Sequence, residues 1–331
     1  MELGLSPGII LVVGDNGVGK TNLLEALHVG TQGFSPRTRS EGQLLRFGER
    51  EALLSLEIDR SAVRHRVTLR FGAGTAKQAE LDGARLPSAE ALRRECPARV
   101  FTPDRLSVVK GGPAVRRAYL DRTAGRLFPP RLAAPQDYLA ALTQRNAALR
   151  RIQLGVSGRD ALGPWTEQVA GLGAKLVNLR RETVAALQPG FAERAEELGL
   201  AGARLAYDGE PATAAALEAR LEQDVARGAT GLGPHLDDVV IAAAGRELRS
   251  FGSQGEQRLA VLSLLLGEAE LLHREPLLLL DDVLSELDPH RRAVLAARIE
   301  TMGQVVITAT ERASFPIDPA QVVEVSPGQA R

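Results

Sequence analysis

Residues 9–26 read IILVVGDNGVGKTNLLEA, which places a strand, a glycine-rich loop and a helix in direct succession. The five apolar residues 9–13, partly β-branched, predict a buried parallel strand. The loop at 14–21 matches the pattern G-x-x-x-x-G-K-[ST], and the apolar residues after it have helical spacing. A phosphate-binding loop requires its elements in this order.

The chemistry of such a loop explains its residue types. Glycines let successive backbone N–H groups point at phosphate oxygens, and the helix that begins near Lys20 adds the positive end of its dipole. Lys20 would reach the β- and γ-phosphates of ATP, and the Thr21 hydroxyl would bind Mg²⁺. The alternative is a glycine-rich turn that matches by chance. The predicted nucleotide contacts in this stretch are Gly14, Asp15, Asn16, Gly17, Val18, Gly19, Lys20, Thr21 and Asn22.

The composition limits the class of protein. A chain of 331 residues, 44% apolar and 25% charged, is long enough for one large domain or two modest ones. No apolar run approaches the roughly 20 residues that span a bilayer, and the N-terminus has no signal sequence, so a cytoplasmic location without membrane contact is expected. The single Cys96 excludes intramolecular disulfides and a cysteine-based zinc site.

The net charge is zero, but the charges are unevenly distributed. Residues 99–151 contain eleven basic and three acidic side chains, whereas residues 193–300 contain eleven basic and twenty acidic ones. The basic block could bind nucleic-acid phosphates or face the acidic block of the same or a neighbouring chain. With aromatic residues at only 4%, stacking on unpaired bases is poorly supported, and phosphate contacts are expected instead.

The order of the remaining patterns predicts a core interrupted by a helical lobe. Residues 53–71 alternate as two half-buried antiparallel strands. Helical spacing then occupies 115–127, 139–154, 165–187 and 191–198, and a nearly all-apolar helix follows at 258–273. We therefore expect an α/β fold, with residues 1–102 and 231–331 forming a nucleotide-binding lobe of mixed sheet and antiparallel β layer. Residues 103–230 would form the inserted helical arm lobe.

Three motifs near the end of the chain accompany the loop. Four leucines lead into Asp281-Asp282 like a Walker B strand, in which Asp281 would hold Mg²⁺ through water and Asp282 would polarise the attacking water. The segment GSQGE at 252–256 is similar to the signature of ATP-binding cassettes, in which Ser253 and Gly255 would face a γ-phosphate. An ordinary capping box formed by Ser253 and Glu256 is the structural alternative. The segment SELD at 285–288 is similar to a D-loop.

Several segments across the chain resemble the RecF family of bacterial recombination mediators, which are related to Rad50 and the SMC proteins. They are GDNGVGKTNLLEA (14–26), FTPDRLSVVKGGPAVRRAYLD (101–121), QRNAALR (144–150), GPHLDD (233–238), FGSQGEQR (251–258) and LLLLDDVLSELDPHRR (277–292). The resemblance implies a P-loop ATPase of the Rad50-head type with weak, DNA-stimulated activity. It also implies that two copies form a homodimer that closes on ATP. The dimer would bind duplex DNA near single-stranded gaps and would act with RecR and RecO to load RecA.

The resemblance also directs attention to individual residues. Ser253 and Gly255 of one copy would face the triphosphate held by Lys20 of the other. Arg105, Lys110, Arg116 and Arg117 are the candidate DNA contacts, and Arg37 is a candidate ATP or DNA contact. Leu236 stands where the family usually has arginine, Thr308 or Thr310 occupies the switch position, and His235 is expected to be structural.

Two other functions share the ATPase motifs. The motor subunit of a membrane transporter would need a compact helical subdomain, and the long insertion with its RecF-like segments argues against it. An SMC-like structural tether would need a sustained heptad pattern, which the helical segments lack.

Overall fold

The structure is a computed structural model that describes residues 2–38, 40–60, 63–72, 74–272 and 274–331. The chain folds into two compact units. The first combines Met1–Arg105 with His273–Arg331, and the second is the continuous stretch Leu106–Leu272. The predicted nucleotide-binding lobe also included residues 231–272, but these residues belong to the second unit. The reason is local pairing, because β8 (Asp238–Ala243) pairs with β7 (Arg204–Asp208) and α10 (Gln254–Glu270) packs along α6 (Gly163–Glu197).

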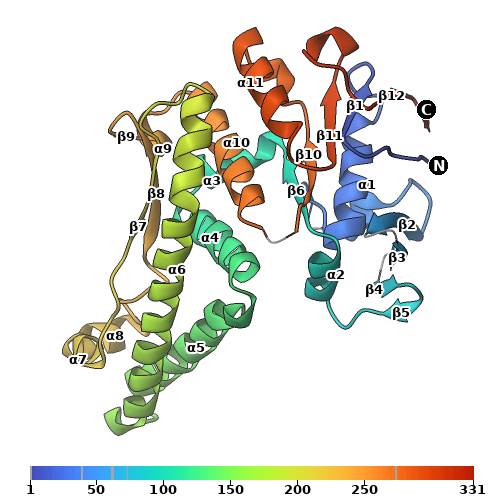
Figure 1. Cartoon of the computed structure of the whole chain (residues 1–331). Coiled ribbons are helices and arrows are strands. Elements are labelled where there is room, and N and C mark those ends of the chain that lie inside the picture. Colours follow the sequence, from blue (N-terminus) through green and yellow to red (C-terminus); the bar gives the residue numbers. More distant parts are fainter. Residues whose placement is uncertain (1, 39, 61–62, 73, 273) are drawn as a thin grey trace. The chain divides into compact units, whose positions relative to one another are not determined.

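The first unit is built on a mainly parallel sheet (Figure 1). Its strand order is β13-β12-β1-β11-β10-β6, and only β13 pairs antiparallel to its neighbour. The central strands are nearly completely buried, because this sheet carries apolar residues on both faces. The strands are β1 (Ile9–Val13), β6 (Ala98–Phe101), β10 (Leu277–Leu280), β11 (Val305–Ala309), β12 (Gln321–Ser326) and β13 (Gln329–Ala330).

A second, antiparallel sheet follows the order β2-β3-β4-β5. Its strands are β2 (Glu51–Arg60), β3 (Val63–Gly72), β4 (Thr75–Leu81) and β5 (Ala84–Arg85). The alternating pattern at 53–71 forms the β2–β3 pair, as predicted. Helix α1 (Lys20–Gln32) contacts strands of both sheets and places Leu24 in one core and Val29 in the other. A Cβ atom on Gly30 of this helix would lie 2.6 Å from a terminal methyl group of Leu56, so a larger residue here would displace that side chain on β2.

Two further helices complete the first unit, α2 (Ala89–Glu95) and α11 (Pro289–Ile299). Both begin with a capped turn, since Ser88 accepts a hydrogen bond from the N–H of Ala91 and Asp288 accepts one from the N–H of Arg291.

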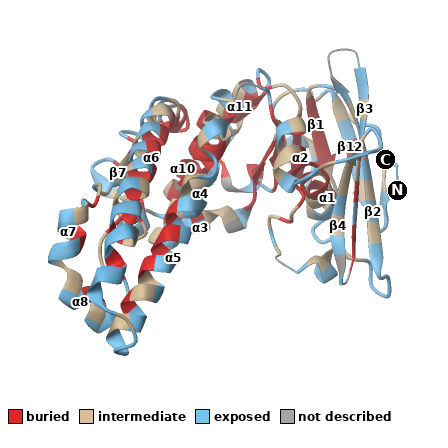
Figure 2. Ribbon diagram, turned by 90° about the horizontal axis from the view of Figure 1, so that it is seen from below, coloured by how far each residue is buried: buried red, intermediate tan, exposed pale blue. Residues whose placement is uncertain are grey.

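The second unit consists mainly of helices around the small sheet β7-β8-β9 (Figure 1). Its helices are α3 (Ser107–Lys110), α4 (Pro113–Leu127), α5 (Ala134–Gln153), α6, α7 (Ala214–Ala219), α8 (Leu221–Arg227), α9 (Leu248–Phe251) and α10, and β9 is Arg246–Glu247. Helix α10 is buried over most of its length, as its apolar sequence predicts (Figure 2). Within the described residues, none of the helices has the length and apolar character needed to cross a membrane.

Helix α6 differs from the prediction. The sequence indicated two helices, at 165–187 and 191–198, but a single helix continues through Pro189. Next to Pro189, α6 packs closely against α10, and a Cβ atom on Gly190 would lie 3.3 Å from the Gly267 Cα atom.

Candidate nucleotide-binding site

The glycine-rich loop between β1 and α1 has the backbone conformation of an anion-binding nest. Gly14, Gly17 and Gly19 have φ values of 152°, 83° and 114°, a region that favours glycine. A Cβ atom on Gly14 would lie 2.4 Å from the Val325 carbonyl oxygen, whereas the positions beside Gly17 and Gly19 open into free space. Alternating conformations of this kind turn backbone N–H groups toward a common centre, which suits phosphate oxygens.

The start of helix α1 provides positive charge beside this loop. Gly19 is the N-cap residue, and no side chain caps the helix. The Lys20 ammonium group donates hydrogen bonds to the carbonyl oxygens of Gly14 at 2.5 Å and Asp15 at 2.9 Å. The ammonium therefore lies directly over the loop, where it adds to the helix dipole in attracting an anion.

The end of strand β10 brings Asp281 to the same place. Its side chain is only 5% exposed, and its Oδ1 atom accepts hydrogen bonds from the hydroxyls of Thr21 at 3.1 Å and Thr308 at 3.0 Å. Burial raises the pKa of Asp281, while the two hydroxyl groups and the more distant Arg37 act in the opposite direction. The structure thus brings Thr21 and Asp281 into contact, as expected for two residues that share a Mg²⁺ ion, although their role as ligands stays a prediction.

The oxygen atoms at this point fit Mg²⁺, which prefers hydroxyl, carboxylate, water and phosphate oxygens. Among the described residues, no group of three or more His, Cys, Asp or Glu side chains could hold a metal ion alone. A Mg²⁺ ion here would therefore take Thr21, Asp281 through water, and phosphate oxygens of a bound nucleotide as its ligands.

Asp282 is held by its backbone, and its carboxylate is exposed. It has a positive φ of 52°, which is uncommon for a residue with a side chain. Its N–H group donates to the Thr308 hydroxyl at 2.8 Å, and its carbonyl oxygen accepts from the Ser285 hydroxyl at 3.0 Å. Of the two predicted switch residues, Thr308 is therefore the one joined to both acids, while Thr310 is exposed. The side chain of Glu286 in the D-loop-like segment lies outside the described residues.

A second group of polar residues lies close to the acids. Ser35 donates a short hydrogen bond to Glu25, and its hydroxyl oxygen accepts the N–H of Arg37 at 3.0 Å. The Arg37 guanidinium is 3.5 Å from Glu25, and its charge acts on Asp281. This supports the choice of Arg37 as a nucleotide contact. Sequence reasoning did not find Glu25, because a glutamate on the first helix carries no pattern of its own.

The signature turn, residues 252–256, caps helix α10. The Ser253 hydroxyl oxygen accepts the N–H of Glu256 at 3.2 Å, and the Glu256 carboxylate accepts the N–H of Ser253 at 2.7 Å. The hydrogen bond that the carboxylate accepts from the Ser253 N–H group lowers the pKa of Glu256. Both hydrogen bonds of the predicted capping box are therefore present. Ser253 and Gly255 are nevertheless exposed, so the capping box does not prevent the turn from meeting another molecule.

The candidate DNA contacts differ widely in exposure. Arg116 is 2% exposed, and its guanidinium donates two hydrogen bonds to the Asp238 carboxylate at 2.6 and 2.8 Å. It has a structural role and is not available to DNA in this conformation, contrary to the prediction. Arg117 donates to the Asp237 carbonyl oxygen at 2.5 Å, and burial together with the nearby Arg180 lowers its pKa. Arg105 is half-buried, and Lys110 is exposed at the end of α3.

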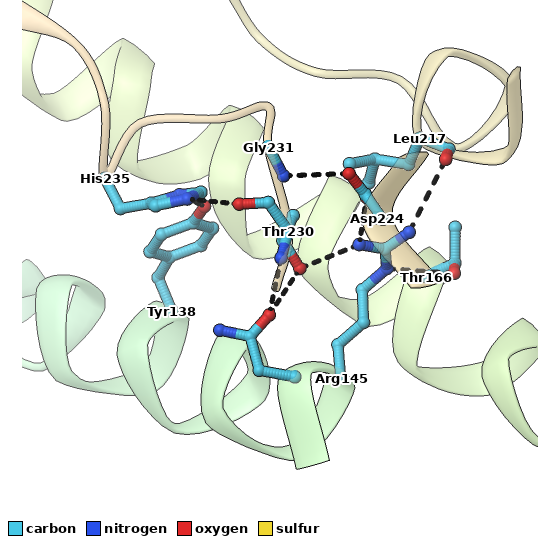
Figure 3. A network of polar contacts seen from close by, with 9 residues as sticks. Tyr138, Arg145, Thr166, Leu217, Asp224, Thr230, Gly231 and His235 are labelled. Carbon is cyan, nitrogen blue, oxygen red and sulfur yellow. Dashed lines mark hydrogen bonds and ion pairs between the residues drawn. The ribbon is translucent and has the colours of Figure 1, made fainter. Parts of the chain in front are cut away.

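Two RecF-like segments of the second unit, 144–150 and 233–238, contribute side chains to a buried polar network (Figure 3). Arg145 and Asp224, both 0% exposed, form an ion pair at 2.9 Å, and Arg145 also donates to the Thr230 hydroxyl at 2.7 Å. His235 completes the network with contacts to Tyr138 at 2.7 Å and the Thr230 carbonyl oxygen at 3.0 Å. A carbonyl oxygen only accepts, so Nε2 carries the proton of a neutral imidazole, and burial lowers the pKa of His235. These contacts support the expectation that His235 is structural.

Known proteins are similar to this chain over most of its length. The family model of the RecF/RecN/SMC N terminal domain matches residues 1–327. The DNA replication and repair protein RecF of Anaeromyxobacter dehalogenans strain 2CP-C is 39% identical over 340 residues, covering 94% of this chain and 89% of that protein. The RecF protein of Heliobacterium modesticaldum is 34% identical over 333 residues, covering 95% of this chain and 90% of that protein.

Solved structures show the same fold. A structure of the recombination mediator protein RecF-ATP in the RecFOR pathway superposes with a TM-score of 0.86 at 26% identity, covering 99% of this chain and 92% of that one. The Smc head domain of Pyrococcus furiosus matches with a TM-score of 0.59 at 17% identity, covering 98% of this chain and 89% of that one, which is a likeness of fold alone.

Together, the fold and the phosphate loop with its facing acid define a P-loop protein of the SMC-head class. The family model and the curated relatives narrow this class further. The chain belongs to the RecF family. This membership confirms the predicted fold class and does not support the transporter alternative.

Proposed function

We propose that the chain is an ATP-dependent, DNA-binding recombination mediator that acts in the cytoplasm at gaps and junctions between single-stranded and duplex DNA. The contact between Thr21 and Asp281, 260 residues apart in sequence, is the observation that supports ATP and Mg²⁺ binding best. The names of the relatives, which are DNA replication and repair proteins, and the solved RecF-ATP structure support the biological role.

In this proposal each residue of the nucleotide site has one task. Lys20 leaves the loop carbonyls and binds the β- and γ-phosphates, while Thr21 and Asp281 hold Mg²⁺. Asp282, held through its backbone by Thr308, polarises the attacking water. Hydrolysis is slow and DNA-stimulated, so that ATP serves as a switch between closed and open states.

The switch requires a second copy of the chain. Ser253 and Gly255 of one copy contact the γ-phosphate bound by the other, and ATP closes the dimer. Two features of the signature turn support this arrangement. Its serine and glycine are exposed at the N-terminus of a 17-residue helix, and the adjacent Phe251 is 68% exposed, as is common for apolar residues of an interaction surface.

DNA binding in this proposal rests on the backbone phosphates. Exposed Lys110 is the strongest candidate, followed by Arg105 and Arg117. RecR and RecO are the proposed protein partners, and the loading of RecA is the proposed outcome.

Light scattering of the protein alone, with Mg-ATP, and with Mg-ATP plus gapped duplex DNA tests these steps. We expect a dimer with Mg-ATP and ATP-enhanced, salt-dependent DNA binding.

Lys20→Met should abolish ATP binding, while Lys175→Met, at an exposed position on α6, should not. Asp282→Asn should retain ATP and accumulate dimer, so a monomeric, ATP-saturated Asp282→Asn protein would contradict the dimer. Retained ATP binding without DNA affinity at low salt would contradict the mediator role.

A further inference from the structure

The buried side chain of Gln257 connects helix α10 to the signature turn through hydrogen bonds. Gln257 lies in the first turn of α10 and is only 4% exposed. Its amide nitrogen donates hydrogen bonds to the carbonyl oxygens of Leu248 at 2.8 Å and Gly252 at 3.1 Å. Its Oε1 atom is buried and has no hydrogen-bond partner within the described structure.

The two carbonyl groups mark both ends of the short helix α9. Leu248 begins α9 and is buried, which anchors this end in the unit, while Gly252 follows its last residue. The N–H of Gly252 also donates to the Leu248 carbonyl oxygen at 3.1 Å, and a Cβ atom on Gly252 would lie 2.6 Å from that oxygen. One buried amide group therefore closes a tight turn that leads directly into Ser253.

Helix capping alone does not explain this side chain. The exposed capping box of Ser253 and Glu256 already satisfies the start of α10. A buried amide oxygen without a partner is unfavourable, so an apolar side chain of similar size would serve packing better than Gln257 does. The carboxamide is explained by the hydrogen bonds that its nitrogen donates to the carbonyl oxygens of Leu248 and Gly252. These bonds fix the backbone before and after Phe251.

We propose that Gln257 is a positioning residue for ATP-dependent self-association of the chain. It fixes α9 and the signature turn on α10, so that Ser253 and Phe251 are presented together to the second copy. This inference rests on the proposed function, because it needs a dimer in which the signature turn meets the nucleotide of the partner. Gln257 itself does not touch the nucleotide.

The variant Gln257→Leu tests this role, with Ser263→Ala as the matched control. Ser263 is also buried on α10, but its hydroxyl donates to the Leu259 carbonyl oxygen of its own helix. We expect Gln257→Leu to bind ATP as the wild type does and to form the Mg-ATP dimer at least tenfold more weakly in sedimentation experiments. Hydrogen exchange of the amides at 252–256 should be faster in the unliganded Gln257→Leu protein. Ser263→Ala should change neither measurement. If Gln257→Leu does not fold, Gln257→Met takes its place.

The outcomes separate the two claims. Wild-type dimerisation and unchanged exchange in the Gln257 variant would overturn the positioning role while leaving the proposed function intact. A wild-type protein that binds Mg-ATP and stays monomeric would overturn the proposed dimer and this inference with it.

Discussion

The substitution Thr308→Val tests the geometry of the two acids most directly. It preserves the shape of a buried side chain and removes one hydroxyl group, which donates to Asp281 at 3.0 Å and accepts from the N–H of Asp282 at 2.8 Å. A hydrogen bond to a charged carboxylate contributes about 1.5–3 kcal/mol and one to a neutral peptide group about 1 kcal/mol. The expected loss in the free energy of unfolding is therefore about 3 kcal/mol.

The same change should impair catalysis. Removing a group that orients a metal-binding carboxylate typically lowers metal affinity or activity by about 10–100-fold. We expect a fall of this size in Mg-ATP turnover, measured by phosphate release, together with the loss of stability measured by urea titration. The matched control is Thr310→Val, two residues away and exposed. Equal effects of the two substitutions would refute the assignment of Thr308 as the residue that holds the acids.

Three other predictions concern stability, DNA and pH. Arg145→Met should destabilise the protein by about 3–5 kcal/mol in urea titrations, because it leaves buried Asp224 without its partner, whereas exposed Arg150→Met should have little effect. Lys110→Ala should weaken DNA binding and reduce the slope of log affinity against log salt by about 0.9, and an unchanged slope would remove Lys110 from the DNA surface. Because burial raises the pKa of Asp281 and Mg²⁺ binds the ionised form, acidification should weaken Mg²⁺-dependent ATP binding at a higher pH than for an exposed aspartate. Asp281→Asn should remove this pH dependence, which ATP titrations at several pH values would reveal.

The local patterns of the sequence were sufficient to locate the phosphate loop and the acid that contacts it. Strand β1 has the predicted bounds, and the loop pattern requires a strand before it and a helix after it. Asp281 follows four leucines, and any parallel strand beside β1 or its neighbour delivers its last residue to the same edge of the sheet. The residues of the site therefore lie in short stretches, and their order along the chain makes each stretch easier to interpret.

The properties that escaped prediction depend on partners far away in sequence. Arg116 has the sequence context of an exposed arginine, and its burial is balanced mainly by the ion pair with Asp238, 122 residues later. Pro189 predicts a helix end locally, but α6 continues through it along α10, from which it is distant in sequence. Residues 231–272 likewise belong to the second unit because β8 pairs with β7. No local sequence pattern predicts this pairing.

The discontinuity of the first unit has a consequence for synthesis of the protein. Strand β1 pairs with β11 and β12, so the phosphate loop leaves the ribosome long before the strands on which it rests. The second unit is one uninterrupted stretch and has all its residues available first. A nascent chain must therefore keep an apolar strand unpaired while an entire helical unit is translated. Premature termination before residue 321 would leave β1 with β11 on one side but without β12 on the other.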